Sequence, residues 1–292
     1  MWLRISIMCL TFIAVPAQSN KNDIIHFQAS ADSPLAQARY IKGDPNKPTV
    51  LILHGFLATH HFSTVQTMQD QLSFDGYTSL TPTLTLQVPL RNQSLNCNSL
   101  HTHTLQQDLN EIQGWIKWLE NHGHQHIVLI GHSSGSQQLL EALIQHTPAS
   151  IKALISTSLF YLNGEELGIR QQDLQIAHQQ LKQPHAEPQK FNFLYCQQDY
   201  LATAESYVSY LVINRQRVIQ QLNQLKLPSY TIMGSADSRY QLVGKEWLGE
   251  LAKTTTNLIT IEGANHFFAH QHEATLHQQI QQILVGLEAA HD

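Results

Sequence analysis

Residues 127–146 read IVLIGHSSGSQQLLEALIQH and carry the clearest structural signal in the chain. The apolar run Ile127–Ile130 predicts a buried strand, and the stretch Gln137–His146 predicts a helix. Between the two lies the pentapeptide G-x-S-x-G at residues 131–135. This pattern is typical of a sharp strand-to-helix turn that presents a serine side chain.

Two serines are adjacent in this turn, but only one has glycine at both the minus two and the plus two positions. That residue is Ser133, flanked by Gly131 and Gly135, which leave room for strand and helix to approach closely. The sequence therefore predicts Ser133 as a nucleophile. Ser134 is then the first helical residue, and its backbone N–H is expected to contribute to an oxyanion hole.

Length and composition indicate one large globular domain. The chain has 292 residues, of which 42% are hydrophobic and 13% charged, and its formal net charge is −5. No basic cluster is present, which argues against nucleic-acid binding. There is no phosphate-cradling G-x-G-x-x-G, and we expect no cofactor. The composition does not predict the oligomeric state.

The N-terminus resembles an export signal. Arg4 is followed by an apolar stretch, Ile5–Val15, and by small residues before a predicted cleavage site after Ala17. This stretch is far shorter than the ~20 residues of a membrane-spanning helix. We therefore expect a signal peptide at residues 1–17, a mature chain at 18–292 with no stable membrane span, and a periplasmic or secreted location.

Removal of the leader would leave two cysteines, Cys97 and Cys196. In an oxidising compartment these two residues can form a disulfide, and two free buried thiols are the alternative. Sequence alone does not decide between the two states.

Strand-like and helix-like segments alternate along the chain, which predicts an α/β fold with a doubly wound, mostly parallel sheet. A helix is expected over Leu105–Leu119, a second from Leu242 to Ala252 and a third from about Glu273. The seventy or so residues between two of the strands, about 159–227, are too many for a connecting loop. We predict a helical cap there, inserted after the sixth strand. The other expected strands are Thr49–His54, Tyr77–Leu80, Ala153–Thr157, Tyr230–Met233 and Asn257–Ile261.

Together these motifs resemble the α/β-hydrolase superfamily, of the serine esterase or lipase type with a helical cap. The resemblance rests on the order of four motifs: His54-Gly55-Phe56 after a strand, the elbow serine, an acid after a later strand, and a histidine near the end. It implies that the Phe56 N–H is the second oxyanion donor, that His54 and Gly55 order its loop, and that the acid and the histidine are Asp237 and His266.

The acid of the set has more than one candidate. Asp237 ends Gly234-Ser235-Ala236-Asp237, and an aspartate in such a turn can also simply stabilise its own loop. Asp199 and Glu262 are weaker substitutes. His266 follows the last predicted strand, and no other histidine is placed as well.

The chain has 18 histidines, several of them clustered. None of the clusters has a recognised zinc spacing, so we expect histidine-rich surface loops and no metal site. The clusters are His60-His61, His101 with His103, and His122 with His124 and His126.

Two classes of function follow from these residues. The first is an exported serine hydrolase that cleaves a small-molecule carboxylic ester or thioester through an acyl-enzyme intermediate. The second is a catalytically idle protein of the same fold that binds a ligand or partner through its cap. Amide and carbon–carbon bond hydrolysis use the same three residues and remain open. The aromatic residues of the cap are expected to serve mainly in packing, with some of them lining the pocket.

Overall fold

The computed structural model describes residues 22–183 and 185–289. The predicted signal peptide, residues 1–17, lies outside the described residues.

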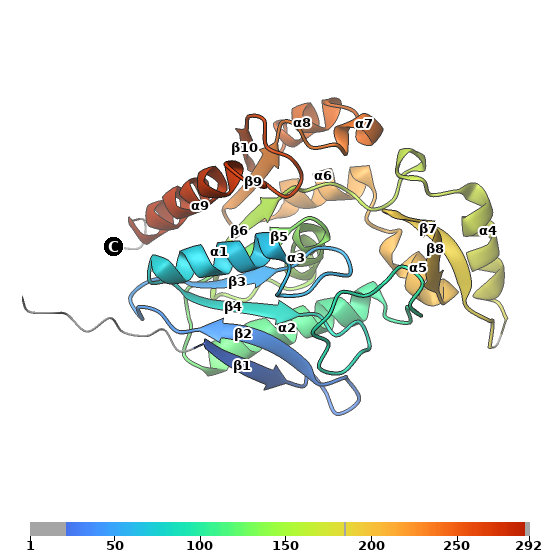
Figure 1. Ribbon diagram of the computed structural model, residues 1–292, viewed down its shortest axis with the longest axis horizontal. Helices are drawn as coiled ribbons and strands as arrows, with labels where there is room; N and C mark the ends of the chain where they lie inside the picture. Colours follow the sequence, from blue (N-terminus) through green and yellow to red (C-terminus); the bar gives the residue numbers. More distant parts are fainter. Residues whose placement is uncertain (1–21, 184, 290–292) are drawn as a thin grey trace, which may run out of the picture.

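In the described part of the chain, eight strands form one mixed sheet in the order β1-β2-β4-β3-β5-β6-β9-β10 (Figure 1). The pairs from β4 to β10 are parallel, whereas β1 pairs antiparallel with β2, and β2 with β4. The central strands are apolar and buried along their whole length, as expected for parallel strands covered on both faces. The strands are β1 Asn22–Phe27, β2 Ala36–Ile41, β3 Thr49–Leu53, β4 Thr78–Thr83, β5 Ile127–His132, β6 Ile151–Thr157, β9 Ser229–Gly234 and β10 Asn257–Ile261.

Helices cover both faces of this sheet and create two separate hydrophobic cores (Figure 1). On one face α1 (Ser63–Phe74) packs against α9 (His272–Ala289). On the other face α3 (Ser134–Gln145) packs between α2 (Leu105–Asn121) and α6 (Arg215–Gln224). The sheet is therefore doubly wound, and the predicted fold class is confirmed.

The segment between β6 and β9 differs from the expected helical cap. Besides the 3-10 turn Glu165–Leu167, α4 (Gln171–Gln180) and α5 (Ala204–Tyr210), it contains a two-stranded antiparallel sheet of β7 (Gln189–Phe193) and β8 (Cys196–Ala202). The expectation of a wholly helical cap was wrong. In β7, Phe191 and Phe193 are buried, whereas Lys190 is exposed and Asn192 is only partly buried, which is the two-residue period of a strand.

A disulfide and backbone hydrogen bonds link the cap to the loop that precedes α2. A disulfide joins Cys97 of that loop to Cys196 at the start of β8, with the two Cα atoms 5.4 Å apart. Three backbone hydrogen bonds continue the contact. They are Leu201 N–H to Cys97 O at 3.0 Å, His101 N–H to Leu201 O at 2.8 Å and Thr203 N–H to His101 O at 3.1 Å.

The helix expected from Leu242 to Ala252 is two helices, α7 (Tyr240–Val243) and α8 (Glu246–Leu251). Gly244 separates them with φ at 80°, a left-handed value that no α-helix can contain. Within the described ranges, no helix combines the length and the apolar character needed to cross a bilayer.

Candidate active site

Ser133 lies between β5 and α3 in a strained backbone conformation, with φ at 53° and ψ at −124°. Such values cost a non-glycine residue about 1–3 kcal/mol and persist only where the surroundings enforce them. Here the Ser133 N–H donates to the carbonyl of Thr157 on β6 at 2.9 Å. A Cβ at Gly131 would lie 2.5 Å from Cα of Ser136, and one at Gly135 would collide with the carbonyl oxygen of His54. Both glycines are therefore required by close packing.

The side chain of Ser133 is the first member of a hydrogen-bonded series. Its Oγ lies 2.9 Å from Nε2 of His266, and Nδ1 of His266 donates to Oδ2 of Asp237 at 2.6 Å. The Asp237 side chain is fully buried, and that of His266 is 9% exposed. The carboxylate fixes the histidine tautomer, because Nδ1 must carry the proton and Nε2 then presents a lone pair to the serine hydroxyl.

Two further residues fix the loop that carries His266. Oγ of Ser158, directly after β6, donates to the carbonyl of His266 at 2.6 Å. Oδ1 of Asn265 accepts from the backbone N–H groups of Phe267 and Ala269, at 3.0 and 3.1 Å. Neither residue was predicted from the sequence, since nothing in the local pattern around Ser158 indicates a contact 108 residues away.

His54 directly follows β3, and both of its ring nitrogens are hydrogen-bonded. Its Nδ1 donates to the carbonyl of Gly55 at 2.8 Å, and its Nε2 accepts from the backbone N–H of Leu84 at 3.1 Å. Burial, reinforced by the nearby Arg91 cation, lowers the pKa of His54 to about 3, so the ring is neutral. A Cβ at Gly55 would lie 3.2 Å from Cβ of Ser133, which places the Gly55–Phe56 backbone directly beside the serine.

Arg91 is a second organiser of this loop that sequence analysis did not find. Its guanidinium is buried and donates to four backbone carbonyls rather than to a carboxylate. These are the carbonyls of Ala58 at 2.7 Å, Leu84 at 2.8 Å, Gln93 at 3.0 Å and Leu57 at 3.2 Å. Arg91 thereby joins the segment after β3 to the segment after β4.

Ser133 and His266 open into a cavity of about 250 Å³. Most of its wall is apolar or aromatic, and Arg239 is the one permanently charged side chain among the described residues that line it. The others are Gly55, Phe56, Ala58, Phe62, Ser94, His132, Tyr195 and Phe267. Tyr195, at the tip of the β7–β8 hairpin, is the one lining residue from the cap within the described ranges, and the sequence analysis did not name it.

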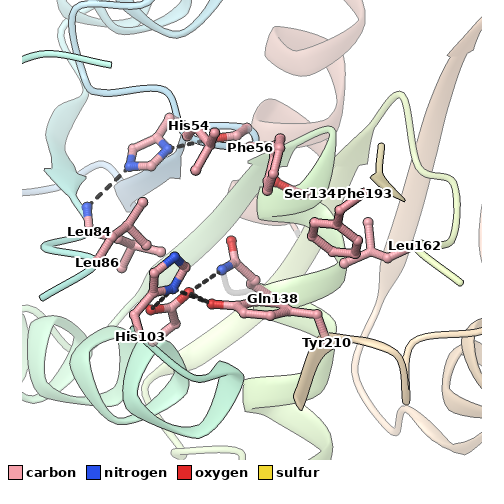
Figure 2. Close-up of a pocket in the computed structure, with 13 residues that line it drawn as sticks. His54, Phe56, Leu84, Leu86, His103, Ser134, Gln138, Leu162, Phe193 and Tyr210 are labelled. Atoms are coloured by element: carbon pink, nitrogen blue, oxygen red, sulfur yellow. Dashed lines mark hydrogen bonds and ion pairs between the residues drawn. The ribbon is translucent and has the colours of Figure 1, made fainter. Parts of the chain in front are cut away.

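Phe56 and Ser134 also line a second, much smaller pocket of about 20 Å³. Figure 2 shows His103, Gln138 and Tyr210 pointing toward one another in it. They converge on buried Asp108, whose Oδ2 accepts from Tyr210 Oη at 2.5 Å and from Gln138 Nε2 at 2.8 Å. His103 Nδ1 lies 2.6 Å from the Tyr210 hydroxyl. This buried polar cluster joins α5 of the cap to α2 and α3 of the body.

The remaining sequence candidates lie elsewhere. Asp199 forms an exposed ion pair with Lys190, with Nζ and Oδ1 2.8 Å apart, and Glu262 is exposed. The expectation that the clustered histidines lie on surface loops was wrong for His60, His101 and His103. These three side chains are buried, because the loops that carry them are covered by β4 or by the cap. Within the described ranges, no group of three histidine, cysteine or acidic side chains could hold a metal ion.

A profile of the alpha/beta hydrolase fold matches residues 48–194. The chain belongs to the α/β-hydrolase fold family. A comparison with curated proteins finds no match.

Solved structures of α/β hydrolases share the whole architecture at low sequence identity. Est1E from Butyrivibrio proteoclasticus has a TM-score of 0.63 and 18% identity, covering 91% of this chain and 99% of that one. The α/β hydrolase GrgF from Penicillium sp. sh18 has a TM-score of 0.69 and 14% identity, covering 92% and 99%. A thioesterase domain from the curacin biosynthetic pathway has a TM-score of 0.57 and 17% identity, covering 90% and 100%. At these identities the likeness concerns the fold alone.

Proposed function

We propose that this α/β-hydrolase is an exported serine hydrolase that cleaves a carboxylic ester or thioester through an acyl-enzyme intermediate. One observation carries the proposal: the series Ser133–His266–Asp237 is joined by hydrogen bonds at the wall of a largely apolar cavity. A solved thioesterase domain among the structural neighbours supports the choice of an acyl substrate.

The geometry supports the following sequence of steps. Nε2 of His266 takes the proton of Ser133 while Oγ attacks the carbonyl carbon, and Asp237 stabilises the imidazolium that forms. The N–H groups of Phe56 and Ser134 bind the oxyanion. His266 then protonates the departing alkoxide or thiolate, which leaves an acyl group on Ser133. A water molecule, activated by the same histidine, releases the acid.

Export is supported by the leader pattern at residues 1–17 and by the bond between Cys97 and Cys196. Disulfides persist in oxidising compartments such as the periplasm and the extracellular space.

The test is hydrolysis of a chain-length series of p-nitrophenyl esters by residues 18–292, beside a fluorophosphonate label that reacts with activated serines. We expect Ser133→Ala to lose turnover and labelling together. Folded wild-type protein that shows neither on any acyl length would contradict the proposal and favour the idle binding protein. Labelling without turnover would identify a working serine with a narrower substrate.

The acid has a matched control in the same chain. Asp237→Asn is expected to lower kcat by about 10³- to 10⁴-fold, because it offers the wrong hydrogen-bond partner to Nδ1 of His266. Asp199→Asn removes an exposed carboxylate of the same type, already paired with Lys190, and is expected to leave kcat unchanged. Equal losses in the two variants would show that Asp237 has no special role.

A further inference from the structure

Arg239 presents a positive charge to the nucleophile cavity without a partner of its own. It lies at the start of α7 and lines the same cavity as Ser133 and His266. Within the ranges 22–183 and 185–289, its guanidinium forms no hydrogen bond or ion pair. The guanidinium lies over the ring of Phe160, with Cζ of Arg239 5.9 Å from the ring centroid.

The other arginines of the described chain are all engaged, so an unpaired guanidinium is unusual in this protein. Arg91 is held by four carbonyls, as described above. The remaining four each pair with a carboxylate: Arg39 with Asp70, Arg170 with Asp173, Arg215 with Glu250 and Arg217 with Glu141.

The nearby acid does not satisfy Arg239. Both oxygens of Asp237 are used, Oδ2 by Nδ1 of His266 and Oδ1 by the backbone N–H of Arg239 at 2.9 Å. Burial lowers the pKa of Arg239 below its ordinary value, and Asp237 offsets only part of that effect. The half-buried guanidinium thus keeps donors that no group of the described residues accepts.

Among the described residues that line the cavity, no second fixed cation competes for this position. The other basic side chain to consider is His132. The Thr157 hydroxyl donates its proton to the carbonyl of Gly131 at 3.0 Å, so the same hydroxyl accepts a hydrogen bond from Nδ1 of His132, also at 3.0 Å. Burial and the neighbouring His266 hold the pKa of His132 well below its usual range, which leaves that ring neutral. The cavity therefore combines one fixed positive charge with walls of aromatic rings from Phe56, Phe62, Tyr195 and Phe267.

We propose that the substrate carries a carboxylate in addition to the bond that is cleaved, and that Arg239 binds this carboxylate while the aromatic walls enclose the apolar part of the molecule. The inference rests on the proposed hydrolase function, whose active site it shares. A guanidinium matches a carboxylate with two parallel N–H···O bonds, which would also orient the scissile carbonyl toward Ser133.

The test compares two pairs of esters, each pair differing only in a carboxylate against a carboxamide. 3-Acetoxybenzoate and 3-acetoxybenzamide place the group on the alcohol side, and monoethyl glutarate and ethyl glutaramate place it on the acyl side. We expect the wild type to favour the carboxylate in at least one pair by 10-fold or more in kcat/KM. Arg239→Gln is expected to lower that ratio by about 10- to 100-fold, and Arg239→Lys to restore part of it.

Lys245→Gln is the matched control for net charge. It removes one exposed positive charge a few residues along the same segment and does not line the cavity, so the ratio should not change. Thermal melting confirms that each variant is folded. A wild type that treats carboxylate and carboxamide alike in both pairs, or an equal loss in Arg239→Gln and Lys245→Gln, overturns the proposal.

A binding measurement separates this proposal from the proposed hydrolase function. Ser133→Ala, with and without Arg239→Gln, is titrated by calorimetry with the same four esters, which needs no turnover. If no ester is hydrolysed but the carboxylates bind more tightly than the carboxamides only when Arg239 is present, the anion site stands and the hydrolase proposal fails. If esters are cleaved but their affinity depends neither on the carboxylate nor on Arg239, the hydrolase proposal stands and the anion site fails.

Discussion

The disulfide between Cys97 and Cys196 allows a quantitative prediction about stability. The two cysteines are 99 residues apart. In the chain-entropy account, a cross-link that closes a loop of about 100 residues raises the free energy of unfolding by about 4.7 kcal/mol at 25 °C, because it restricts the unfolded chain. Measured values are more often about 2–4 kcal/mol, so we expect a loss of about 2–5 kcal/mol when the bond is absent.

The native structure should change little on reduction, because three backbone hydrogen bonds join the same loop to β8 independently of the sulfurs. The effect should therefore appear as lower stability, with circular dichroism under native conditions preserved. With an m-value of about 3 kcal/mol/M in urea, a loss of about 2–5 kcal/mol should lower the midpoint of unfolding by about 0.7–1.7 M.

The assay is urea unfolding of residues 18–292 in oxidised and reduced form, with free thiols counted in each sample. The double variant Cys97→Ala with Cys196→Ala reports the same loss without a reductant, and reduced wild type controls for the volume that alanine removes. A midpoint that moves by less than about 0.3 M, with both thiols shown to be free, would refute the entropic reasoning.

Three other predictions concern buried groups. Burial raises the pKa of the Glu111 carboxyl to about 7. The folded state therefore retains a proton that the unfolded state releases from about pH 4.5. Because of this difference, the contribution of Glu111 to the free energy of unfolding falls as the pH rises from about 4.5 to 7. The wild-type free energy of unfolding relative to Glu111→Gln should accordingly fall by about 3 kcal/mol across that range in urea titrations at several pH values, and a constant difference would contradict the shift. Arg91→Lys keeps the positive charge but loses the planar set of guanidinium donors, and steady-state kinetics should show a lower kcat with a smaller change in KM. An unchanged kcat would show that the loop after β3 keeps its conformation without the guanidinium. Tyr210→Phe removes a donor from buried Asp108 and should cost about 1–3 kcal/mol of unfolding free energy, measured by urea unfolding, while a neutral effect would mean that water replaces the hydroxyl.

Sequence patterns predicted the central part of the fold because its physical signals are local. Buried parallel strands are continuous apolar runs, so β3 and β5 could be recognised within a residue or two of their ends. The edge strand β10 is only partly buried, but its branched residues still indicated its bounds. The helix α2 follows a clear 3.6-residue period and begins with Thr104, whose side chain caps it.

The elements that the sequence analysis missed have weaker local signals. Strand β1 lies at the edge of the sheet and mixes polar with apolar residues without a regular period, and β2 beside it also runs antiparallel to its neighbours. Helix α1 has few apolar residues, and the β7–β8 hairpin lies within a segment rich in glutamine. The burial of His101 and His103 depends on the cap, which no local pattern places above them.

The candidate site divides in the same way. Ser133, Asp237 and His266 each follow a strand at a characteristic place in the chain order, so sequence indicated all three, and the structure joins them by hydrogen bonds. Tyr195 and Arg239 line the cavity only because separate segments meet there, and neither lies in a motif.

The contacts of Arg91 have a consequence for how this protein can vary among related chains. Its guanidinium binds carbonyl groups of the main chain, which every amino acid possesses. The four residues that supply those carbonyls are therefore free to mutate as far as this network is concerned, whereas the arginine has no substitute with five fixed donors. The side chains of Leu57, Ala58 and Leu84 are buried and are constrained by packing, but this network itself places a requirement on the arginine alone. Related chains should therefore keep this arginine, although it does not line the cavity that holds Ser133.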